Sequence, residues 1–194
     1  NLLREIFFFR ILMVSKGQLL ISDMSLAEDS IFRRSVILIC DNENNTSPMG
    51  FILNKPLKIN LSNIISKVSK KLKVHFGGPV SSDTLFCIHK SELKLKSSKH
   101  VTKDLRYGCD LNEVVMRVEN GELNEENIMF FLGYSGWTND QLLEELSQSC
   151  WKISKKTSKI IFEKSEENLW NKMAKKINGG FYIWSNAPEN IKDN

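Results

Sequence analysis

The sequence is poor in cysteine, and its four cysteines are too far apart to form a metal-binding or redox motif. They are Cys40, Cys87, Cys109 and Cys150, with no Cys-x-x-Cys spacing among them. Structural disulfides belong to oxidising compartments, and no clear secretory signal is recognisable. We therefore expect four reduced thiols that pack as small hydrophobic side chains, in a cytoplasmic protein.

Long hydrophobic runs are also missing. A membrane-spanning helix needs about 20 mostly apolar residues, and the apolar stretch within residues 1–16 is interrupted by Arg4, Glu5 and Arg10. We predict no membrane association. Because Met13 has the sequence context of a natural start, residues 1–16 are expected to be an N-terminal extension or arm, of which 1–12 precede that start. Residues 17–194 contain no Pro/Gly/Ser-rich linker and are expected to form a single domain.

Recognisable nucleotide-binding and metal-binding motifs are lacking. The segment Gly77-Gly78-Pro79 follows an expected strand but has neither the further glycines nor the lysine of a phosphate-binding loop. The three histidines, His75, His89 and His100, include no pair spaced four residues apart, as two metal ligands on one helix face would be. We predict no cofactor and no metal ion.

Net charge is low, +4, but charge is unevenly distributed along the chain. Residues 67–103 carry nine lysines against two acidic residues, and residues 104–150 carry ten acidic residues against two arginines. The basic stretch has no arginine, the residue that leads base readout, and no helix-turn-helix pattern. Direct DNA binding is therefore disfavoured relative to a solvated lysine-rich face, and opposite patches favour self-association as a homo-oligomer.

Short apolar, β-branched runs outnumber helical patterns and occur in series rather than in alternation with helices. A polar segment at 42–48 is expected to join two strands as a hairpin. This order favours an α+β fold with a mixed, largely antiparallel sheet. Strands are predicted at 18–22, 35–41, 49–54, 72–76, 84–89, 100–103, 127–132, 151–154, 160–162 and 181–184, and helices at 61–71, 111–118, 139–147 and 166–178.

Four ordered segments carry a family resemblance. They are Gly17-Gln-Leu-Leu-Ile-Ser22 with Phe32-Arg-Arg-Ser-Val36, Gly50-Phe-Ile-Leu-Asn-Lys-Pro56, Gly77-Gly-Pro-Val80, and Phe131-Leu-Gly-Tyr-Ser-Gly-Trp137 with the later Gln141, Glu145 and Trp151. In this order and spacing, over roughly residues 17–190, the chain resembles the AlgH/YqgE family. It departs from the family pattern at Met24, at Ser135 and at Thr138-Asn139-Asp140.

The resemblance implies a fold and a broad role. The fold would be a bifurcated β-sheet rolled into a pseudo-barrel, with helices packed outside. The family's founding member is named as a transcriptional regulator of alginate synthesis, which implies a regulatory role here. The resemblance implies neither a cofactor nor a catalytic residue.

Six residues are candidates for a ligand site. Arg34 opens an expected strand, where it either binds an anion or forms an ion pair, and Asn54 is either a ligand contact or a turn residue. His89 closes an expected strand, as a ligand contact or as a structural, hydrogen-bonded histidine. The remaining candidates lie in or after the Gly-Tyr-Ser-Gly-Trp segment and are Tyr134, Trp137 and Gln141.

The Gly-Tyr-Ser-Gly-Trp segment has two interpretations. It lies between an expected strand and an expected helix N-terminus, where backbone amides attract anions, which suggests a ligand loop. Alternatively it is a tight turn that requires glycine dihedral angles, with Tyr134 and Trp137 anchored in the core. We favour the turn. Ser135 is not expected to be a nucleophile, because its flanking pattern differs from Gly-x-Ser-x-Gly.

We expect a regulatory module that binds a protein or a small ligand. The alternative is an enzyme with a site around the Gly-Tyr-x-Gly-Trp segment, in which His89, Tyr134 and Gln141 would converge. Catalytic groups act at hydrogen-bond reach, so the distances among these side chains discriminate between the two readings.

Overall fold

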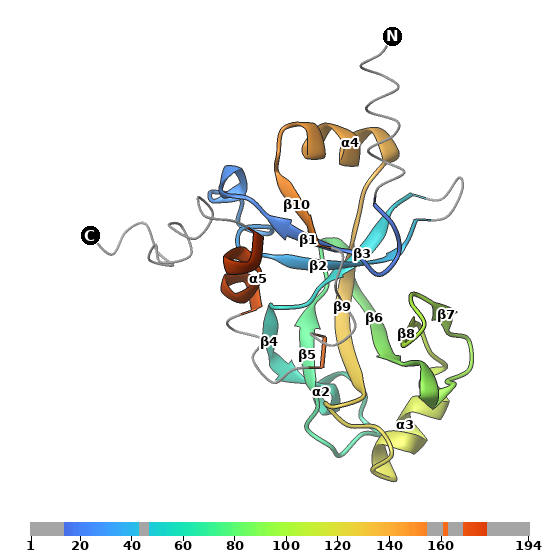
Figure 1. The fold of residues 1–194 in the computed structure, drawn as a ribbon. Coiled ribbons are helices and arrows are strands. Elements are labelled where there is room, and N and C mark those ends of the chain that lie inside the picture. Colours follow the sequence, from blue (N-terminus) through green and yellow to red (C-terminus); the bar gives the residue numbers. More distant parts are fainter. Residues whose placement is uncertain (1–13, 43–46, 155–160, 163–168, 178–194) are drawn as a thin grey trace.

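The computed structural model describes residues 14–42, 47–154, 161–162 and 169–177, and its sheet and helices are arranged as shown in Figure 1. None of the helices in these ranges is long and apolar enough to cross a membrane. The strands are β1 (Leu19–Ser22), β2 (Val36–Asp41), β3 (Met49–Ile52), β4 (Pro56–Asn60), β5 (Lys73–Phe76), β6 (Val80–Lys90), β7 (Lys99–His100), β8 (Leu105–Tyr107), β9 (Ile128–Gly136) and β10 (Trp151–Ser154). The helices are α2 (Leu61–Ile64), α3 (Leu111–Glu119), α4 (Asn139–Ser147) and α5 (Leu169–Ile177), with short 3-10 turns η1 (Met24–Leu26) and η2 (Ser91–Leu93).

The sheet divides at β9. The main path runs β10-β1-β2-β3-β9-β6-β8-β7, and β5, with β4 on its outer edge, also pairs with β9. The C-terminal end of β9 pairs with β3, and its middle pairs in parallel with β5 over Phe130–Leu132. All other pairings are antiparallel. The sheet curls into a half-barrel, which confirms the predicted α+β class and its bifurcated, mixed sheet.

Three hydrophobic clusters fill the spaces between the sheet and its helices. The first contains Leu169, Trp170, Met173 and Ala174 of α5. The second contains Val114 and Val118 of α3, and the third contains Leu142 and Leu146 of α4. Each helix thus buries one apolar stripe, as an amphipathic surface helix does. Val14, within the segment expected to be an N-terminal arm, is buried in the third cluster.

Close backbone packing at the fork in the sheet explains the glycines there. A Cβ on Gly77 would lie 2.2 Å from the carbonyl oxygen of Gly133, and one on Gly78 would lie 2.3 Å from the carbonyl carbon of Tyr134. The Gly77 carbonyl accepts hydrogen bonds from the Ile52 amide and from the Ser135 hydroxyl. Glycine is required here because two backbones approach to the distance that a side chain would occupy.

The Gly-Tyr-Ser-Gly segment is not the predicted turn. Residues 133–136 continue β9, with Tyr134 opposite Val80 on β6 and Ser135 opposite Gly50 on β3. Gly133 has a left-handed φ of +69° and lies where the β6–β9 register shifts, so it bends the strand without ending it. The prediction was wrong because pairing with strands on both sides keeps this glycine-rich segment extended.

Three other predictions of secondary structure were wrong. The helix expected at 61–71 ends at Ile64, after one turn, and Val68 packs in the second cluster from irregular backbone. Strand β4 was missed because it begins at Pro56, which an edge strand tolerates. Residues 161–162, expected in a strand, form a turn. The strand expected at 181–184 lies outside the described residues.

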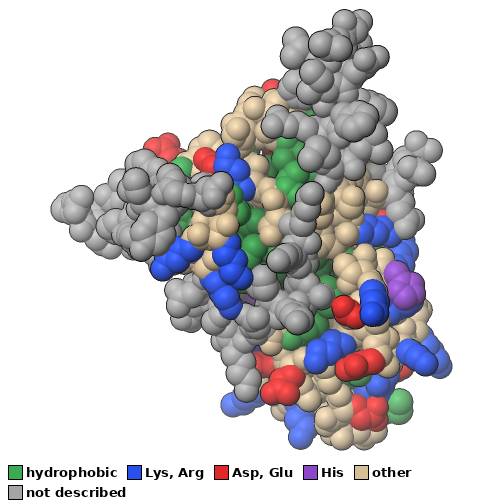
Figure 2. All heavy atoms as spheres, in the orientation of Figure 1, with side chains coloured by type: hydrophobic (Ala, Val, Ile, Leu, Met, Phe, Trp, Pro, Cys, Tyr) green, Lys and Arg blue, Asp and Glu red, His purple; other side chains and the backbone are tan. Residues whose placement is uncertain are grey.

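The basic and acidic stretches of the sequence interleave in the fold. Glu113 accepts a hydrogen bond from the Lys96 amide, Glu119 from the amide and hydroxyl of Ser69, and Glu125 from the Lys73 amide. Figure 2 shows blue and red side chains next to one another at the end of the molecule that carries α3. The charge segregation seen along the chain is therefore reduced on this surface.

Candidate functional site

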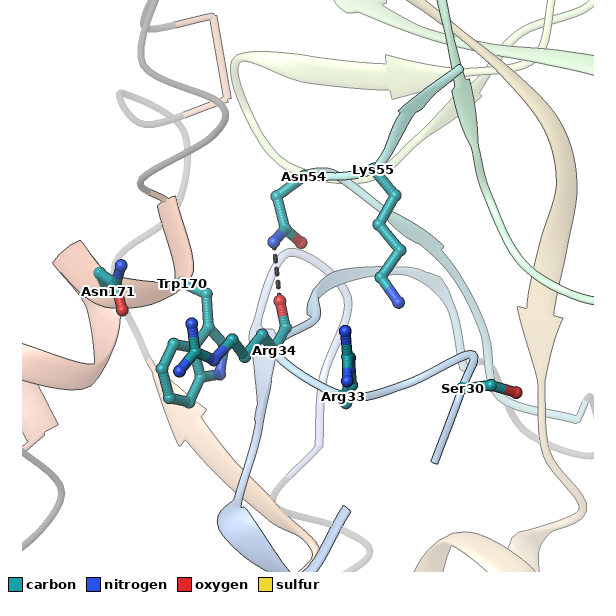
Figure 3. A pocket seen from close by; sticks show the side chains of 7 residues that line it. All are labelled: Ser30, Arg33, Arg34, Asn54, Lys55, Trp170 and Asn171. Atoms are coloured by element: carbon teal, nitrogen blue, oxygen red, sulfur yellow. Dashed lines mark hydrogen bonds between the residues drawn. The ribbon is translucent and has the colours of Figure 1, made fainter. Parts of the chain in front are cut away.

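A cationic hollow of about 290 Å³ lies where three distant chain segments meet (Figure 3). The loop between η1 and β2 forms one wall, the residues that link β3 to β4 form a second, and the start of α5 forms the third. The lining residues are Ser30, Arg33, Arg34, Asn54, Lys55, Trp170 and Asn171.

The first wall is a tight loop built around Asp29. Its carboxylate oxygen Oδ1 accepts hydrogen bonds from the Ile31 amide at 2.8 Å and the Phe32 amide at 2.7 Å. The loop ends at Arg34, whose φ of +49° lies in the left-handed region that non-glycine residues rarely adopt. This turn places the two neighbouring arginines, Arg33 and Arg34, at the rim of the hollow.

Asn54 holds the first wall to the second. Its Nδ2 donates to the Arg34 carbonyl at 2.8 Å, and its Oδ1 accepts from the Val36 amide at 2.8 Å. One side chain therefore satisfies the backbone groups on both sides of Ser35, as a neighbouring strand would. Asn54 positions the Arg34 backbone and is more than the turn residue of the alternative reading.

Lys55 is partly buried beside the same loop. Its Nζ donates a hydrogen bond to the Ile31 carbonyl. Burial lowers the pKa of Lys55 from its ordinary value, the nearby Arg33 lowers it further, and Asp29 partly offsets both effects. An anion in the hollow would favour the charged form of this lysine.

The third wall is Trp170, which α5 places against Arg34. The guanidinium carbon of Arg34 lies 5.4 Å from the centroid of the indole ring, within the range of a cation–π contact. The indole nitrogen donates to the Ser22 carbonyl at 3.0 Å, so the ring is fixed from both sides. Figure 3 shows Arg34 lying along the indole, with the charged ends of Arg33 and Lys55 facing a common space.

This arrangement suits a small anion. Three cationic side chains, Arg33, Arg34 and Lys55, border one hollow, and Asn54 and Asn171 add amide groups. Guanidinium groups bind carboxylates and phosphates with paired, charge-assisted hydrogen bonds. The volume is at the lower end of the range for ligand pockets, about 300 to 1,000 Å³. Phe32 and Ser35, the loop neighbours of the two arginines, pack inward and are not among the lining residues.

Two of the six predicted candidates, Arg34 and Asn54, lie together in this hollow. Arg33, Lys55 and Trp170 were not predicted, although Arg33 and Lys55 lie inside the motifs that carry the family resemblance. Trp170 lies more than a hundred positions further along the chain, and its contact with Arg34 depends on how α5 docks. No local sequence signal identifies such a contact.

His89 is a core residue and does not line the hollow. It is buried in β6, and its Nδ1 donates to the Lys90 carbonyl at 2.9 Å. Its Nε2 is buried without a hydrogen-bond partner in the described part of the chain. Burial, more than the nearby Arg106 and Arg117, lowers the pKa of His89, against the opposing effect of the Lys90 and Gly108 backbone.

The other predicted candidates gather around α4 or pack in the core. Thr138 caps α4 as expected, but the Gln141 side chain donates to Glu145 at 2.9 Å and does not complete a capping box. Glu145 also accepts from the indole nitrogens of Trp137 at 2.8 Å and Trp151 at 2.7 Å. This carboxylate ties α4 to the sheet beneath it.

Tyr134 contacts Phe86 edge-on, at 5.7 Å between ring centroids, and packs against the first cluster. The Ser135 hydroxyl donates to the Gly77 carbonyl at 3.1 Å, which gives it a structural partner. Both residues therefore serve packing at the fork in the sheet.

His89, Tyr134 and Gln141 do not converge on one site. His89 pairs with Ile128 at one end of β9, and Tyr134 pairs with Val80 near the other end. Ile128 and Tyr134 are six positions apart on β9. At about 3.3 Å per residue, His89 and Tyr134 are therefore about 20 Å apart along the strand. Gln141 follows on α4, beyond the end of β9. The shared site of the enzyme alternative is not assembled.

No group of three or more His, Cys, Asp or Glu residues suited to a metal ion occurs in the described ranges. The hollow itself presents cations and amides, which repel metal ions or bind them weakly. The side chains that line the hollow therefore favour an anionic ligand over a metal ion.

The sequence is similar to a recognised protein family. The family model described as AlgH-like matches residues 19–182. The chain is 35% identical over 178 residues to a UPF0301 protein from Cytophaga hutchinsonii, covering 91% of this chain and 97% of that protein. It is 33% identical over 177 residues to a UPF0301 protein from Bacteroides thetaiotaomicron, covering 90% and 89%.

Two solved structures share the fold. One is protein DIP2367 from Corynebacterium diphtheriae, with a TM-score of 0.71 and 18% identity over 90% of this chain and 93% of that one. The other is the AlgH protein from Pseudomonas aeruginosa, with a TM-score of 0.67 and 24% identity over 89% of this chain and 94% of that one. At these identities the likeness concerns the fold alone.

Proposed function

The chain belongs to the AlgH-like family, and we propose that it is a regulatory binding module whose ligand is a small organic anion held in the cationic hollow. The single observation that supports this most strongly is the placement of Arg33, Arg34 and Lys55 around one hollow. The regulatory part of the proposal rests on the family resemblance, and the ligand part rests on the geometry.

The ligand class follows from charge and size. Among the described residues, three cations border the hollow and one carboxylate, Asp29, lies near Lys55. This charge balance favours a ligand with two or more negative charges. A hollow of about 290 Å³ suits a metabolite-sized molecule and not a folded partner. Phosphate and carboxylate groups share the recognition chemistry of paired arginines. We therefore assign the ligand to the small phosphate esters and dicarboxylates.

The left-handed backbone at Arg34 is consistent with a ligand site. Residues held in sparsely populated backbone conformations occur often where a ligand is bound. Four other non-glycine residues, Ser81, Lys94, Ser97 and Ser149, also have positive φ. The positive φ of Arg34 therefore supports the proposal only together with the arginine charges that line the hollow.

Titration calorimetry at low ionic strength tests the proposal, with inorganic pyrophosphate and succinate as the probes. We expect at least one of them to bind. Replacing Arg33 by Ala should weaken binding by about ten-fold, since a charge-assisted hydrogen bond is lost. Arg33 is exposed, so the variant should fold normally.

Lys58→Ala is the matched control, because Lys58 is an exposed cation on β4 that does not line the hollow. It should bind the probe as the unmodified chain does. Equal losses in the Arg33 and Lys58 variants would mean that the probe responds only to overall charge. Failure of both probes to bind at millimolar concentration would refute the proposed ligand class.

We also propose that the module acts in the cytoplasm. The four cysteines are free thiols, as expected where thiols are kept reduced. Detection of the protein by cell fractionation in a compartment other than the cytoplasm would contradict this part of the proposal.

A further inference from the structure

Two of the four cysteines lie next to one another across a strand pair. On β6 and β8, Ile88 is paired with Tyr107 in an antiparallel register. This register places Cys87 opposite Gly108, and the Gly108 amide donates to the Cys87 carbonyl at 2.9 Å. Cys109 is the next residue along, so its Cα lies about 6 Å from that of Cys87. Disulfides span Cα separations of about 4.4 to 6.8 Å.

Gly108 turns the Cys109 side chain toward Cys87. In a regular strand, residues 108 and 109 would point to opposite faces of the sheet. The left-handed φ of +81° at Gly108 breaks this alternation. Cys109 packs against the cluster that contains Cys87, and a hydrogen bond between the two thiols, together with burial, raises the pKa of Cys87.

The two thiols differ in their exposure to solvent. Cys87 is fully buried, whereas Cys109 is partly exposed. A solvent-borne oxidant therefore reaches Cys109 first, and Cys87 is in position to react with the product. The other two cysteines are buried in separate clusters, Cys40 in the first and Cys150 in the third, so neither competes with Cys87 for Cys109.

We propose that Cys87 and Cys109 form a redox-active dithiol that a hydroperoxide converts into an intramolecular disulfide. The Cys109 thiolate attacks the peroxide oxygen and becomes a sulfenic acid, and the released alkoxide or hydroxide takes a proton to leave as alcohol or water. The Cys87 sulfur then attacks the Cys109 sulfur and expels hydroxide, which combines with the proton of the Cys87 thiol as water. The hydroperoxide is reduced by two electrons, and the dithiol is oxidised by two.

The disulfide would fasten the β7–β8 segment to β6. The chain between the two cysteines contains η2, β7 and all of β8. In the reduced protein β8 pairs with β6 at three positions. Oxidation would hold this pairing covalently, and a dithiol reductant would release it.

To test this proposal, the reduced, folded full chain is treated with one equivalent of hydrogen peroxide. The remaining thiols are then alkylated under denaturing conditions. We expect an intact mass lower by two hydrogen atoms before alkylation and only two alkylated cysteines afterwards. Tryptic peptides that contain Cys87 and Cys109 should be joined, and dithiothreitol should separate them.

Two variants make the result specific. Cys109→Ser, at a partly exposed position, should fold and form no intramolecular disulfide, whereas Cys150→Ser should react as the unmodified chain does. The proposal is overturned if the joined peptides contain Cys40 or Cys150. It is equally overturned if Cys109→Ser still forms the disulfide, or if the folded chain retains four free thiols under conditions that oxidise the unfolded chain.

Discussion

At the scale of single residues, the hollow depends on side chains that act on the backbone as well as on those that carry charge. Asn54 joins the Arg34 carbonyl and the Val36 amide, and it thereby fixes the turn that presents both arginines. Val36 is fully buried, so its amide has no access to water if Asn54 is removed.

Replacing Asn54 by Ala should destabilise the protein by about 2 to 3 kcal/mol, because a buried amide and a carbonyl lose their partners. Urea denaturation measures the change in the free energy of unfolding. Asn63→Ala is the control, since Asn63 makes an exposed hydrogen bond to the Asn60 amide and should cost about 1 kcal/mol or less. An equal effect of the two substitutions would contradict the positioning role of Asn54.

His89 makes stability depend on pH in a defined direction. Its pKa is lowered in the folded state, mainly by burial, from a value of 6.5 that the unfolded chain retains. Just below pH 6.5 the unfolded state therefore binds more protons than the folded state. The free energy of unfolding is thus fully retained above pH 6.5 and falls as the pH decreases through that value.

The variant His89→Gln should flatten this decline between about pH 7 and pH 5, whatever its effect at neutral pH. Denaturant titrations at several pH values give the slope. His100→Gln, at an exposed position, is the control and should keep the original slope. A decline in His89→Gln as steep as in the unmodified chain would show that another group is responsible.

At the scale of elements, β9 organises the sheet because strands on both sides pair with it. Its end meets β3, its middle meets β5, and β6 runs along its other edge. At this fork Gly77 and Gly78 allow the backbones to approach. The glycine motifs of the sequence therefore shape the sheet and do not form a ligand loop.

Replacing Gly78 by Ala should destabilise the fold by about 3 kcal/mol or more, because the new Cβ would overlap the backbone of Tyr134 and the φ of +149° is unsuited to alanine. Gly121→Ala is a matched control: Gly121 also has a positive φ, +81°, but a Cβ there meets open space. It should cost about 1 kcal/mol. Thermal unfolding of both variants checks the prediction, and similar melting temperatures would contradict it.

The sequence predicts regular elements well and their connections less well. The apolar, β-branched runs at 18–22 and 35–41 correspond to β1 and β2, and the predicted helix at 111–118 corresponds to α3. The segment 133–136 was misread, because its glycines look like turn residues until β3 and β6 are known to flank it. The pairing of strands far apart in the sequence is not a local property.

At the scale of the whole molecule, the hollow exists only when three distant segments meet. Residues 30–34, 54–55 and 170–171 belong to the loop before β2, the link after β3 and the start of α5. Arg34 and Asn54 were candidates from the sequence, and both line the hollow. Trp170 could not be predicted, since only the docking of α5 on the first cluster brings its ring to Arg34.

The contact between Cys87 and Cys109 also could not be predicted from the sequence. Cys87 and Cys109 are separated by η2, β7 and β8, and nothing in their spacing suggests a contact. They meet because β8 turns back along β6 and Gly108 redirects the chain. The expectation of buried thiols is confirmed for Cys40, Cys87 and Cys150, whereas Cys109 is partly exposed.

The most direct test of the anion site is a nuclear magnetic resonance titration of the isotope-labelled chain with inorganic pyrophosphate. We predict the largest shifts at the amides of residues 30–35, at Asn54 and Lys55, and at the indole N–H of Trp170. Shifts spread instead over the lysines of residues 67–103, with the signals of the hollow unchanged, would contradict it and would indicate a general attraction of anions to basic surface.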